Sequence, residues 1–333
     1  MSPYPQKRLR RLRANATLRG MLAGVRLSVQ ELIAPLFVCE GEHRRVEVPT
    51  MPGQYQLSVD AAIQIVRRWA GAGLPAVLLF GLPARAKKDA QGTSAWDARG
   101  PVQRLCREIK KHSPATLVVT DVCLCEYTDH GHCGVLAKRA DGSMDVDNDS
   151  TLQALSRVAL SHAEAGADLV APSAMMDGQV AAIRSALDGS GHAGVGILAY
   201  AVKFASSLYG PFRDAAGSTP QFGDRRGYQM DYRCPRGAWA EAAADIEEGA
   251  DILMVKPAGA YLDVIADLRR RTDMPIAAYH VSGEYAAIKA AAAAGALDER
   301  AAAMEITTAI KRAGADLVIT YFAEQLAVWL REA

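Results

Sequence analysis

Eight short apolar runs alternate with helical segments along the chain, and this alternation limits the possible folds more than any other feature. The predicted strands are residues 32–38, 76–81, 116–123, 168–173, 196–204, 251–257, 275–282 and 316–321. Strands that are apolar along their whole length are typical of parallel sheets covered by helices. Eight of them favour a closed (β/α)8 TIM barrel over an open doubly wound sheet, because the first run is not followed by a glycine-rich phosphate turn.

Glycine marks the ends of the intervening helices. One helix is predicted to begin at Ser58 and to stop at Gly73, and another to begin at Ser150. Three helices end in the same tripeptide, Gly-Ala-Asp, at residues 166–168, 249–251 and 314–316, and each tripeptide leads into a strand. Glycine readily adopts the left-handed conformation that ends a helix, so the repetition indicates a recurring helix-to-strand turn.

The chain is predicted to consist of an N-terminal arm, residues 1–30, and a catalytic barrel, residues 31–333. A basic cluster at residues 7–13 is typical of RNA-binding tails and transit peptides as well as of oligomer contacts. Apolar anchors stand among the arginines: Leu9, Leu12, Leu18 and Met21. Because no aromatic residue accompanies the arginines after Tyr4, we favour an arm that packs on a neighbouring subunit.

Composition argues against several classes of protein. Half of the residues are apolar, 23% are charged and the formal net charge is +1, which gives no electrostatic case for nucleic acid or membrane binding. No apolar run is long enough to span a bilayer, and the N-terminus lacks the apolar core of a signal peptide. Six cysteines in 333 residues indicate reduced thiols, and therefore a cytoplasmic protein.

Three cysteines, Cys123, Cys125 and Cys133, fall within eleven residues at the end of a predicted strand. Thiolates at this spacing suit zinc, and three protein ligands leave a fourth position for water or substrate. One alternative is a closed site in which His130 or His132 is the fourth ligand. The other is three ordinary buried cysteines.

Two lysines end consecutive predicted strands that are otherwise apolar, Lys203 and Lys256. In a barrel of this type the chemistry lies at the carboxyl ends of the strands, where the two ammonium groups should approach each other. Burial and a like charge both favour the neutral amine that Schiff-base formation requires. Other polar residues at strand ends are Asp121, Ser173, Ser282 and Tyr321.

A long segment at about 205–235 separates Lys203 from the next helix. Irregular segments of this length in compact domains are usually functional lids or disordered. Its aromatic residues favour a lid, and Arg213, Arg225 and Arg226 can hold a carboxylate through paired hydrogen bonds. The alternative is a solvated charged loop.

Several motifs resemble those of the porphobilinogen synthase (δ-aminolevulinic acid dehydratase) family. They are Asp-Val-Cys-Leu-Cys-Glu-Tyr-Thr at 121–128, Gly-His-Cys-Gly at 131–134, Lys-Phe-Ala-Ser-Ser-Leu-Tyr-Gly-Pro-Phe-Arg-Asp at 203–214, Met-Val-Lys-Pro at 254–257 and Tyr-His-Val-Ser-Gly-Glu at 279–284. The resemblance covers essentially the whole chain. It implies a lyase that condenses two δ-aminolevulinate molecules to porphobilinogen with loss of two waters in tetrapyrrole (heme) synthesis, with an N-terminal arm and a homo-octamer.

The resemblance also implies roles for residues of the barrel. Lys256 matches the lysine that forms the Schiff base with the first substrate, and Lys203 matches the lysine that engages the second. Asp121 and Ser173 would be polar support around Lys203.

Substrate and metal contacts follow from the same match. Ser282 and Tyr321 match the hydroxyls that hold the carboxylate of the first substrate. Arg213, Arg225 and Gln229 match the lid residues that hold the carboxylate of the second. The three cysteines match the zinc ligands.

Two departures from the family pattern concern further metals. Gly237 stands where magnesium-responsive members carry a glutamate, so allosteric Mg²⁺ is not expected unless Glu241 substitutes for it. Gly227 stands where animal-type members carry a cysteine, so a second zinc position is not expected, and Cys234 is interpreted as structural.

Two other functions are consistent with parts of the pattern. A different Schiff-base aldolase would explain the lysines but not the three-cysteine loop. A non-catalytic zinc-binding scaffold protein would explain the cysteines but not the paired lysines or the lid.

Overall fold

The core of the computed structural model is a closed ring of eight parallel strands, described within residues 7–234 and 236–332. Around the ring they are β1 (Leu32–Cys39), β4 (Ala76–Leu82), β5 (Leu117–Val122), β8 (Leu169–Pro172), β9 (Gly196–Lys203), β10 (Ile252–Lys256), β11 (Ile276–His280) and β12 (Leu317–Thr320). β12 pairs with β1 and closes the ring. The predicted (β/α)8 TIM barrel is therefore confirmed.

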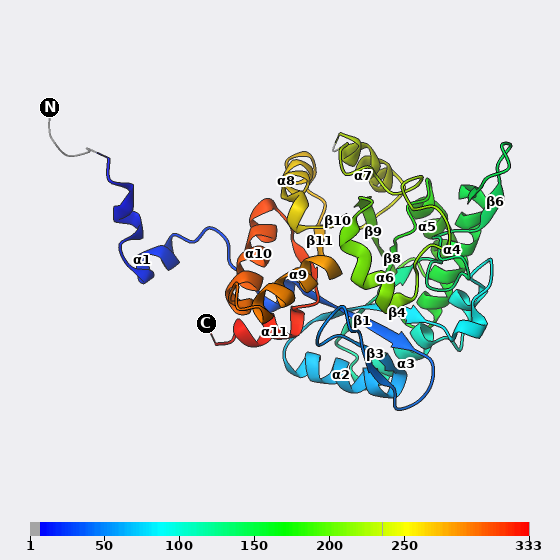
Figure 1. Cartoon of the computed structure of the whole chain (residues 1–333), viewed down its shortest axis with the longest axis horizontal. Coiled ribbons are helices and arrows are strands. Elements are labelled where there is room, and N and C mark those ends of the chain that lie inside the picture. Colours follow the sequence, from blue (N-terminus) through cyan, green and yellow to red (C-terminus); the bar gives the residue numbers. More distant parts are fainter. Residues whose placement is uncertain (1–6, 235, 333) are drawn as a thin grey trace.

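Helices surround the strands (Figure 1). The α-helices are α1 (Ala16–Met21), α2 (Val59–Gly71), α3 (Pro101–His112), α4 (Asn148–Glu164), α5 (Gln179–Gly189), α6 (Gly210–Ala216), α7 (Gly237–Glu247), α8 (Leu262–Arg271), α9 (Ser282–Ala293), α10 (Glu299–Ala313) and α11 (Ala323–Trp329). The 3-10 helices are η1 (Leu9–Arg13), η2 (Val29–Glu31), η3 (Arg85–Lys87), η4 (Thr93–Trp96), η5 (Ser207–Tyr209) and η6 (Gly259–Tyr261). Within the described ranges, no helix is both long and apolar enough to pass through a membrane.

Among the described residues, four short strands lie outside the ring. β3 (Tyr55–Ser58) pairs in parallel with the carboxyl end of β1, and β2 (Arg45–Glu47) pairs antiparallel with β3. β6 (Leu136–Lys138) and β7 (Met144–Val146) form a separate hairpin.

The strands end within one or two residues of the predicted positions, and one helix start was predicted wrongly. α4 begins at Asn148 rather than at Ser150, because Asp147 is its N-cap. The Asp147 carboxylate accepts a hydrogen bond from the Ser150 N–H (2.8 Å), so Ser150 lies inside the first turn.

The repeated Gly-Ala-Asp tripeptides form three equivalent clamps. Each glycine has a positive φ, of 101° at Gly166 and Gly249 and 122° at Gly314, and ends its helix. The following aspartates accept hydrogen bonds at 2.7–2.8 Å from backbone N–H groups at the amino ends of the preceding barrel strands; the pairs are Asp168 with Val118, Asp251 with Ile197 and Asp316 with Ile276. Each tripeptide thus ends a helix and also joins two neighbouring strands.

The predicted lid is partly helical. Its first part forms η5 and α6, and α6 ends at Gly217, which adopts the left-handed conformation (φ 55°). Met230 returns to the end of β9, since its N–H donates to the Lys203 oxygen (3.1 Å) and its oxygen accepts from the Ala205 N–H (2.8 Å). The segment therefore starts and finishes at the same strand end, above the barrel mouth. Residue 235 of the predicted lid lies outside the described residues.

The described part of the N-terminal segment, from residue 7, extends away from the barrel on the side of α10 and α11 (Figure 1). None of the residues of η1 or α1 is buried. Leu9, Leu12, Met21 and Leu22 are 55–74% exposed. Residues 1–6 of the predicted arm and residue 333 of the barrel lie outside the described residues, and the role of the arm in oligomer contacts stays a prediction.

Candidate active site

The strand register places the two lysines side by side at the mouth of the barrel. Lys203 ends β9, Lys256 ends β10, and their Cα atoms are direct partners in the parallel pairing. Both side chains are buried, with only 5% and 6% exposed. Lys203 Nζ donates a hydrogen bond to the backbone oxygen of Ser173 (2.5 Å).

Aromatic rings surround the amine of Lys256. Its Nζ lies 4.5 Å from the ring centroid of Tyr279, 4.9 Å from Tyr200, 5.2 Å from Tyr209 and 5.3 Å from Phe212. Tyr209 and Phe212 belong to the lid, so the closed lid completes this aromatic enclosure. A ring face attracts a cation, but the enclosure also removes water from the amine.

Burial lowers the pKa of Lys256 from 10.5 to about 7. The positive charge of Lys203 acts in the same direction, whereas the Asp121 carboxylate raises this pKa. A substantial fraction of Lys256 is therefore a neutral amine near neutral pH, which is the form that adds to a carbonyl carbon.

Asp121 lies at the end of β5 beside the lysines. Burial and the negative charge of Glu126 raise the pKa of Asp121 to about 7, while the two lysines and a hydrogen bond from Ser173 lower it. Its Oδ1 atom is buried and has no hydrogen-bond partner in the described structure. Such an atom is costly unless a ligand or water satisfies it.

The three cysteines converge into one buried group. Their Sγ atoms lie within 4.8 Å of one another, and those of Cys123 and Cys125 are 3.5 Å apart. Sulfur ligands at about 2.3 Å from a tetrahedral zinc would be roughly 3.8 Å apart. The donor set and spacing therefore fit a metal ion. Asp121 and Glu126 form a second group within 4.8 Å around Cys123.

The ring nitrogens of the two histidines of the loop have hydrogen-bond partners other than the cysteines. His132 Nδ1 lies 3.1 Å from the Tyr228 hydroxyl, and its Nε2 lies 3.0 Å from the Phe222 oxygen. His130 Nδ1 accepts from the His132 N–H (3.1 Å), and its Nε2 lies 3.2 Å from the Ala90 oxygen. All four ring nitrogens have other partners, so this geometry favours a three-cysteine site over a closed site with a histidine ligand.

Two hydroxyls predicted to bind substrate contact residues of the aromatic enclosure. The Tyr321 hydroxyl accepts a hydrogen bond from Tyr279 (3.0 Å). The Ser282 hydroxyl accepts from the Phe212 N–H (3.0 Å) and donates to the Leu208 oxygen (3.2 Å), so it holds the lid to the first turn of α9. Gly283 allows this approach, because a Cβ there would lie 2.5 Å from the Leu208 oxygen.

The lid residues predicted to bind substrate differ in how far their polar atoms have partners. Arg225 is buried and donates from Nη2 to the oxygens of Gly131 (2.9 Å) and Ser218 (2.6 Å). The Nε atoms of Arg213 and Arg225 and both amide atoms of Gln229 are buried without a partner in the described structure. Gln229 lines a cavity of about 360 Å³ that faces β7 and α7. Arg226, also predicted to bind a carboxylate, is exposed and pairs with Asp224 at 3.5 Å.

Comparison with known proteins identifies the family. Residues 6–329 match the family model described as delta-aminolevulinic acid dehydratase. The delta-aminolevulinic acid dehydratase of Halalkalibacterium halodurans is 50% identical over 98% of this chain and 97% of its own length, and that of Methanothermobacter thermautotrophicus is 52% identical over 97% of each. The chain belongs to the delta-aminolevulinic acid dehydratase family.

A solved structure from the family agrees with this fold. The delta-aminolevulinic acid dehydratase (porphobilinogen synthase) of Toxoplasma gondii, in complex with the reaction product porphobilinogen, superposes with a TM-score of 0.95 at 42% identity. The match covers 98% of this chain and 92% of that one. Family membership confirms the predicted porphobilinogen synthase activity and lyase class over the aldolase and the scaffold protein. The individual roles of the site residues stay predictions.

Sequence reasoning missed the aromatic residues that enclose Lys256. Tyr209 and Tyr279 stand inside motifs that carried the family resemblance, yet neither was given a role. Tyr200 lies three residues before Lys203 in an otherwise aliphatic strand, and that break in composition was the available signal. Glu126, 2% exposed and 3.3 Å from Cys125 Sγ, was also missed.

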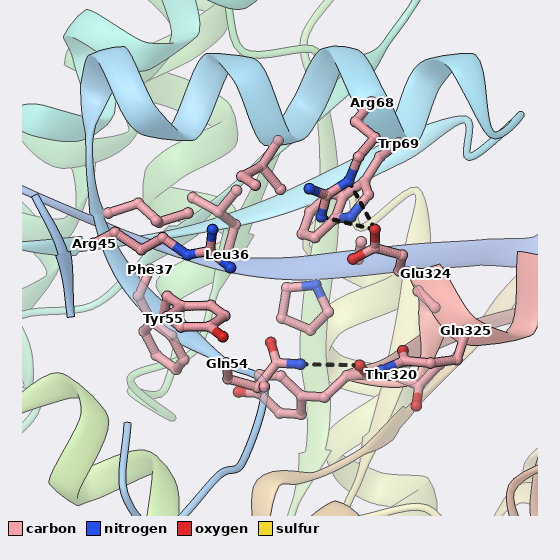
Figure 2. A pocket seen from close by; sticks show the side chains of 17 residues that line it. Leu36, Phe37, Arg45, Gln54, Tyr55, Arg68, Trp69, Thr320, Glu324 and Gln325 are labelled. Carbon is pink, nitrogen blue, oxygen red and sulfur yellow. Dashed lines mark hydrogen bonds and ion pairs between the residues drawn. The ribbon is translucent and has the colours of Figure 1, made fainter. Parts of the chain in front are cut away.

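A small cavity of about 50 Å³ lies between β1, α2 and α11 (Figure 2), and Tyr321 is one of the residues that line it. Arg68, Trp69 and Glu324 line one side, where Arg68 pairs with Glu324 at 2.7 Å. Gln54, labelled in Figure 2, donates to the Tyr321 backbone oxygen (3.2 Å). Neither Lys203 nor Lys256 lines this cavity, so it does not contain the groups proposed to react.

Proposed function

We propose that Lys256 forms the Schiff base through which this chain condenses two δ-aminolevulinate molecules to porphobilinogen. The observation that carries the proposal is a lysine, buried among four aromatic rings, whose pKa lies near 7. Its neutral Nζ adds to the keto carbon of the first substrate, the oxygen takes up protons, and water leaves as the C=N bond forms. The protonated imine then makes the adjacent C–H bond acidic enough for carbon–carbon bond formation.

Lys203 is proposed to engage the second substrate. Support comes from its position beside Lys256 on the neighbouring strand and from its hydrogen bond to the Ser173 backbone. Asp121, with an unpartnered oxygen beside both amines, is proposed to accept and return protons there.

Zinc is proposed as the metal, held by Cys123, Cys125 and Cys133. The support is a buried set of three soft sulfur donors, and such a site binds zinc in preference to magnesium or calcium. Bound zinc would supply Lewis-acid polarisation of a substrate carbonyl.

Two separate groups of residues are proposed to bind the carboxylates of the two substrates. Ser282 and Tyr321 would hold the first substrate, and Arg213, Arg225 and Gln229 the second. Unpartnered buried nitrogens on all three lid residues support this assignment, because a bound carboxylate can satisfy guanidinium and amide donors.

A direct assay tests the function. The purified protein is incubated with δ-aminolevulinate, and porphobilinogen is measured by a colour reaction for pyrroles, with and without a zinc chelator. Product should form, and it should stop after thorough chelation. Failure to form any pyrrole in the zinc-loaded protein would contradict the function, whereas full activity after chelation would contradict the metal centre alone.

The pH dependence of imine formation follows from the pKa of Lys256. Because burial lowers this pKa to about 7, the neutral amine is formed as pH rises through about 7 instead of through the range of an exposed lysine. Trapping the imine with cyanoborohydride at a series of pH values should give a rate that rises to a plateau above neutrality. In Lys203→Met, loss of the neighbouring positive charge raises the pKa of Lys256, so the rise should move to higher pH. A midpoint that does not move would show that Lys203 does not influence the amine.

The exposed N-terminal segment is proposed to dock on a neighbouring subunit of a homo-octamer. Support comes from four large apolar side chains that are more than half exposed, on a segment without a buried residue in η1 or α1. Deleting residues 1–25 should yield smaller assemblies in sedimentation velocity, with reduced activity. Unchanged sedimentation would mean that the segment is a solvated tail.

The remaining expectations concern magnesium and location. Gly237, the first residue of α7, offers no carboxylate, which supports the expectation that magnesium does not stimulate the enzyme. Glu241 lies one helical turn further along and lines a cavity of about 230 Å³ with Asp177, Asp245 and Glu248. A cytoplasmic location also stays a prediction.

A further inference from the structure

His132 is held between two parts of the lid. Its Nδ1 lies 3.1 Å from the Tyr228 hydroxyl and its Nε2 lies 3.0 Å from the Phe222 backbone oxygen. The imidazole ring also packs against the Phe222 ring, with 4.6 Å between centroids. Only 4% of His132 is exposed, so water does not compete for these contacts.

The partners fix which ring nitrogen carries the proton in the neutral imidazole. A backbone oxygen can only accept, so Nε2 carries the hydrogen and donates it to Phe222. Nδ1 is then an acceptor and receives the Tyr228 hydroxyl hydrogen. The Tyr228 oxygen is left free to accept, and the Cys133 N–H points to it at 3.4 Å. Three hydrogen bonds thus form one directed chain from the Cys133 N–H through Tyr228 and His132 to the Phe222 oxygen.

Neighbouring residues of the cysteine loop contact the lid as well. The oxygen of His130 accepts from the Gln221 N–H (3.0 Å), and the oxygen of Gly131 accepts from Arg225 (2.9 Å). Gly131 has a positive φ of 74°, and a Cβ there would lie 2.5 Å from the Thr219 oxygen. The loop that carries Cys133 therefore contacts the lid at four successive residues, 130–133.

We propose that His132 and Tyr228 are positioning residues that couple ion binding at the three cysteines to closure of the lid. Fixing Cys133 for an ion also fixes the hydrogen-bond chain that holds Tyr228 and Phe222. By linkage, a closed lid must then favour ion binding by the same factor as the ion favours closure. This inference rests on the metal centre proposed above.

The test measures lid order and ion affinity separately. Hydrogen–deuterium exchange of peptides covering residues 217–231 reports lid opening, in zinc-loaded and in chelator-treated protein. Equilibrium competition with a chromogenic chelator reports zinc affinity. In the unmodified chain, zinc should slow lid exchange about tenfold, the effect expected from a buried hydrogen bond with its unpaired partners.

Tyr228→Phe keeps the ring and removes the hydroxyl that joins His132 to Cys133. Zinc affinity should fall about tenfold, and the slowing of lid exchange by zinc should shrink to less than about twofold. The second effect distinguishes coupling from simple destabilisation, which would speed exchange equally with and without zinc. His132→Gln provides the same test if Tyr228→Phe does not fold.

Tyr232→Phe is the matched control, since Tyr232 is 59% exposed near the end of the lid. It should leave both measurements unchanged. Zinc uptake without any effect on lid exchange would overturn the coupling alone, as would a tenfold effect retained in both Tyr228→Phe and His132→Gln. A protein that takes up no zinc would overturn both the coupling and the metal centre.

Discussion

Replacing Lys256 by methionine should abolish porphobilinogen formation while leaving the barrel folded. Methionine has a similar length and fills the aromatic enclosure, but it has no amine to form the imine. Turnover should fall by roughly 10⁴-fold or more, as is found when a covalent nucleophile is removed. The change removes an ionisable group that is costly to bury, so thermal stability should be retained or rise.

Two measurements check this result. Cyanoborohydride with δ-aminolevulinate should trap an adduct on Lys256 in the unmodified chain, located by peptide mapping, and none at that position in the variant. Lys87→Met is the control, because Lys87 forms a surface ion pair with Glu40 and is half-exposed. It should retain both adduct and turnover. An adduct confined to surface lysines in the unmodified chain would exclude the Schiff-base assignment.

Replacing Cys133 by alanine should have the next largest effect. Cys133 is fully buried with Cys123 and Cys125, and two remaining thiolates hold zinc poorly. Bound zinc, measured by elemental analysis, should fall from an equimolar amount to near zero. Activity should decrease by about 100-fold or more, since even the loss of an outer-shell partner of a metal site typically costs 10–100-fold.

The chain offers a matched control for this variant in Cys106→Ala. Cys106 is also fully buried, but it lies in α3, and burial raises the pKa of its thiol to about 12, so it stays protonated. This variant should keep its zinc and its activity, with at most a modest loss of stability from the small cavity. Equal zinc contents in Cys133→Ala and the unmodified chain would show that Cys133 is not a ligand.

The barrel could be predicted because its signals are local and repeated. Apolar strands, helix periodicity and glycine stops recur along the chain, and closure follows once eight strands must bury both faces. The adjacency of Lys203 and Lys256 followed from the same pattern, because parallel strands present their carboxyl ends at one face. Strand register then brought two residues 53 positions apart into direct pairing.

The rest of the site depends on contacts that no local pattern encodes. Tyr209 and Phe212 reach Lys256 only because the lid folds back over the barrel, and nothing near them in sequence indicates their direction. The His132–Tyr228 contact joins residues 96 positions apart. By contrast, the helical part of the lid was marked locally by Pro211 in the first turn of α6 and by Gly217 at its end. The helix was nevertheless not predicted, because the remainder of the segment shows an irregular pattern.

The three Gly-Ala-Asp clamps lie at the opposite end of the barrel from the lysines. Each joins the amino ends of two strands, whereas Lys203 and Lys256 occupy carboxyl ends. The contacts that stabilise the barrel and the residues proposed to react therefore lie at opposite ends of it. Substitutions around the clamps can therefore raise thermal stability without changing turnover. The sequence of the lid can likewise vary without weakening the contacts that hold the barrel together.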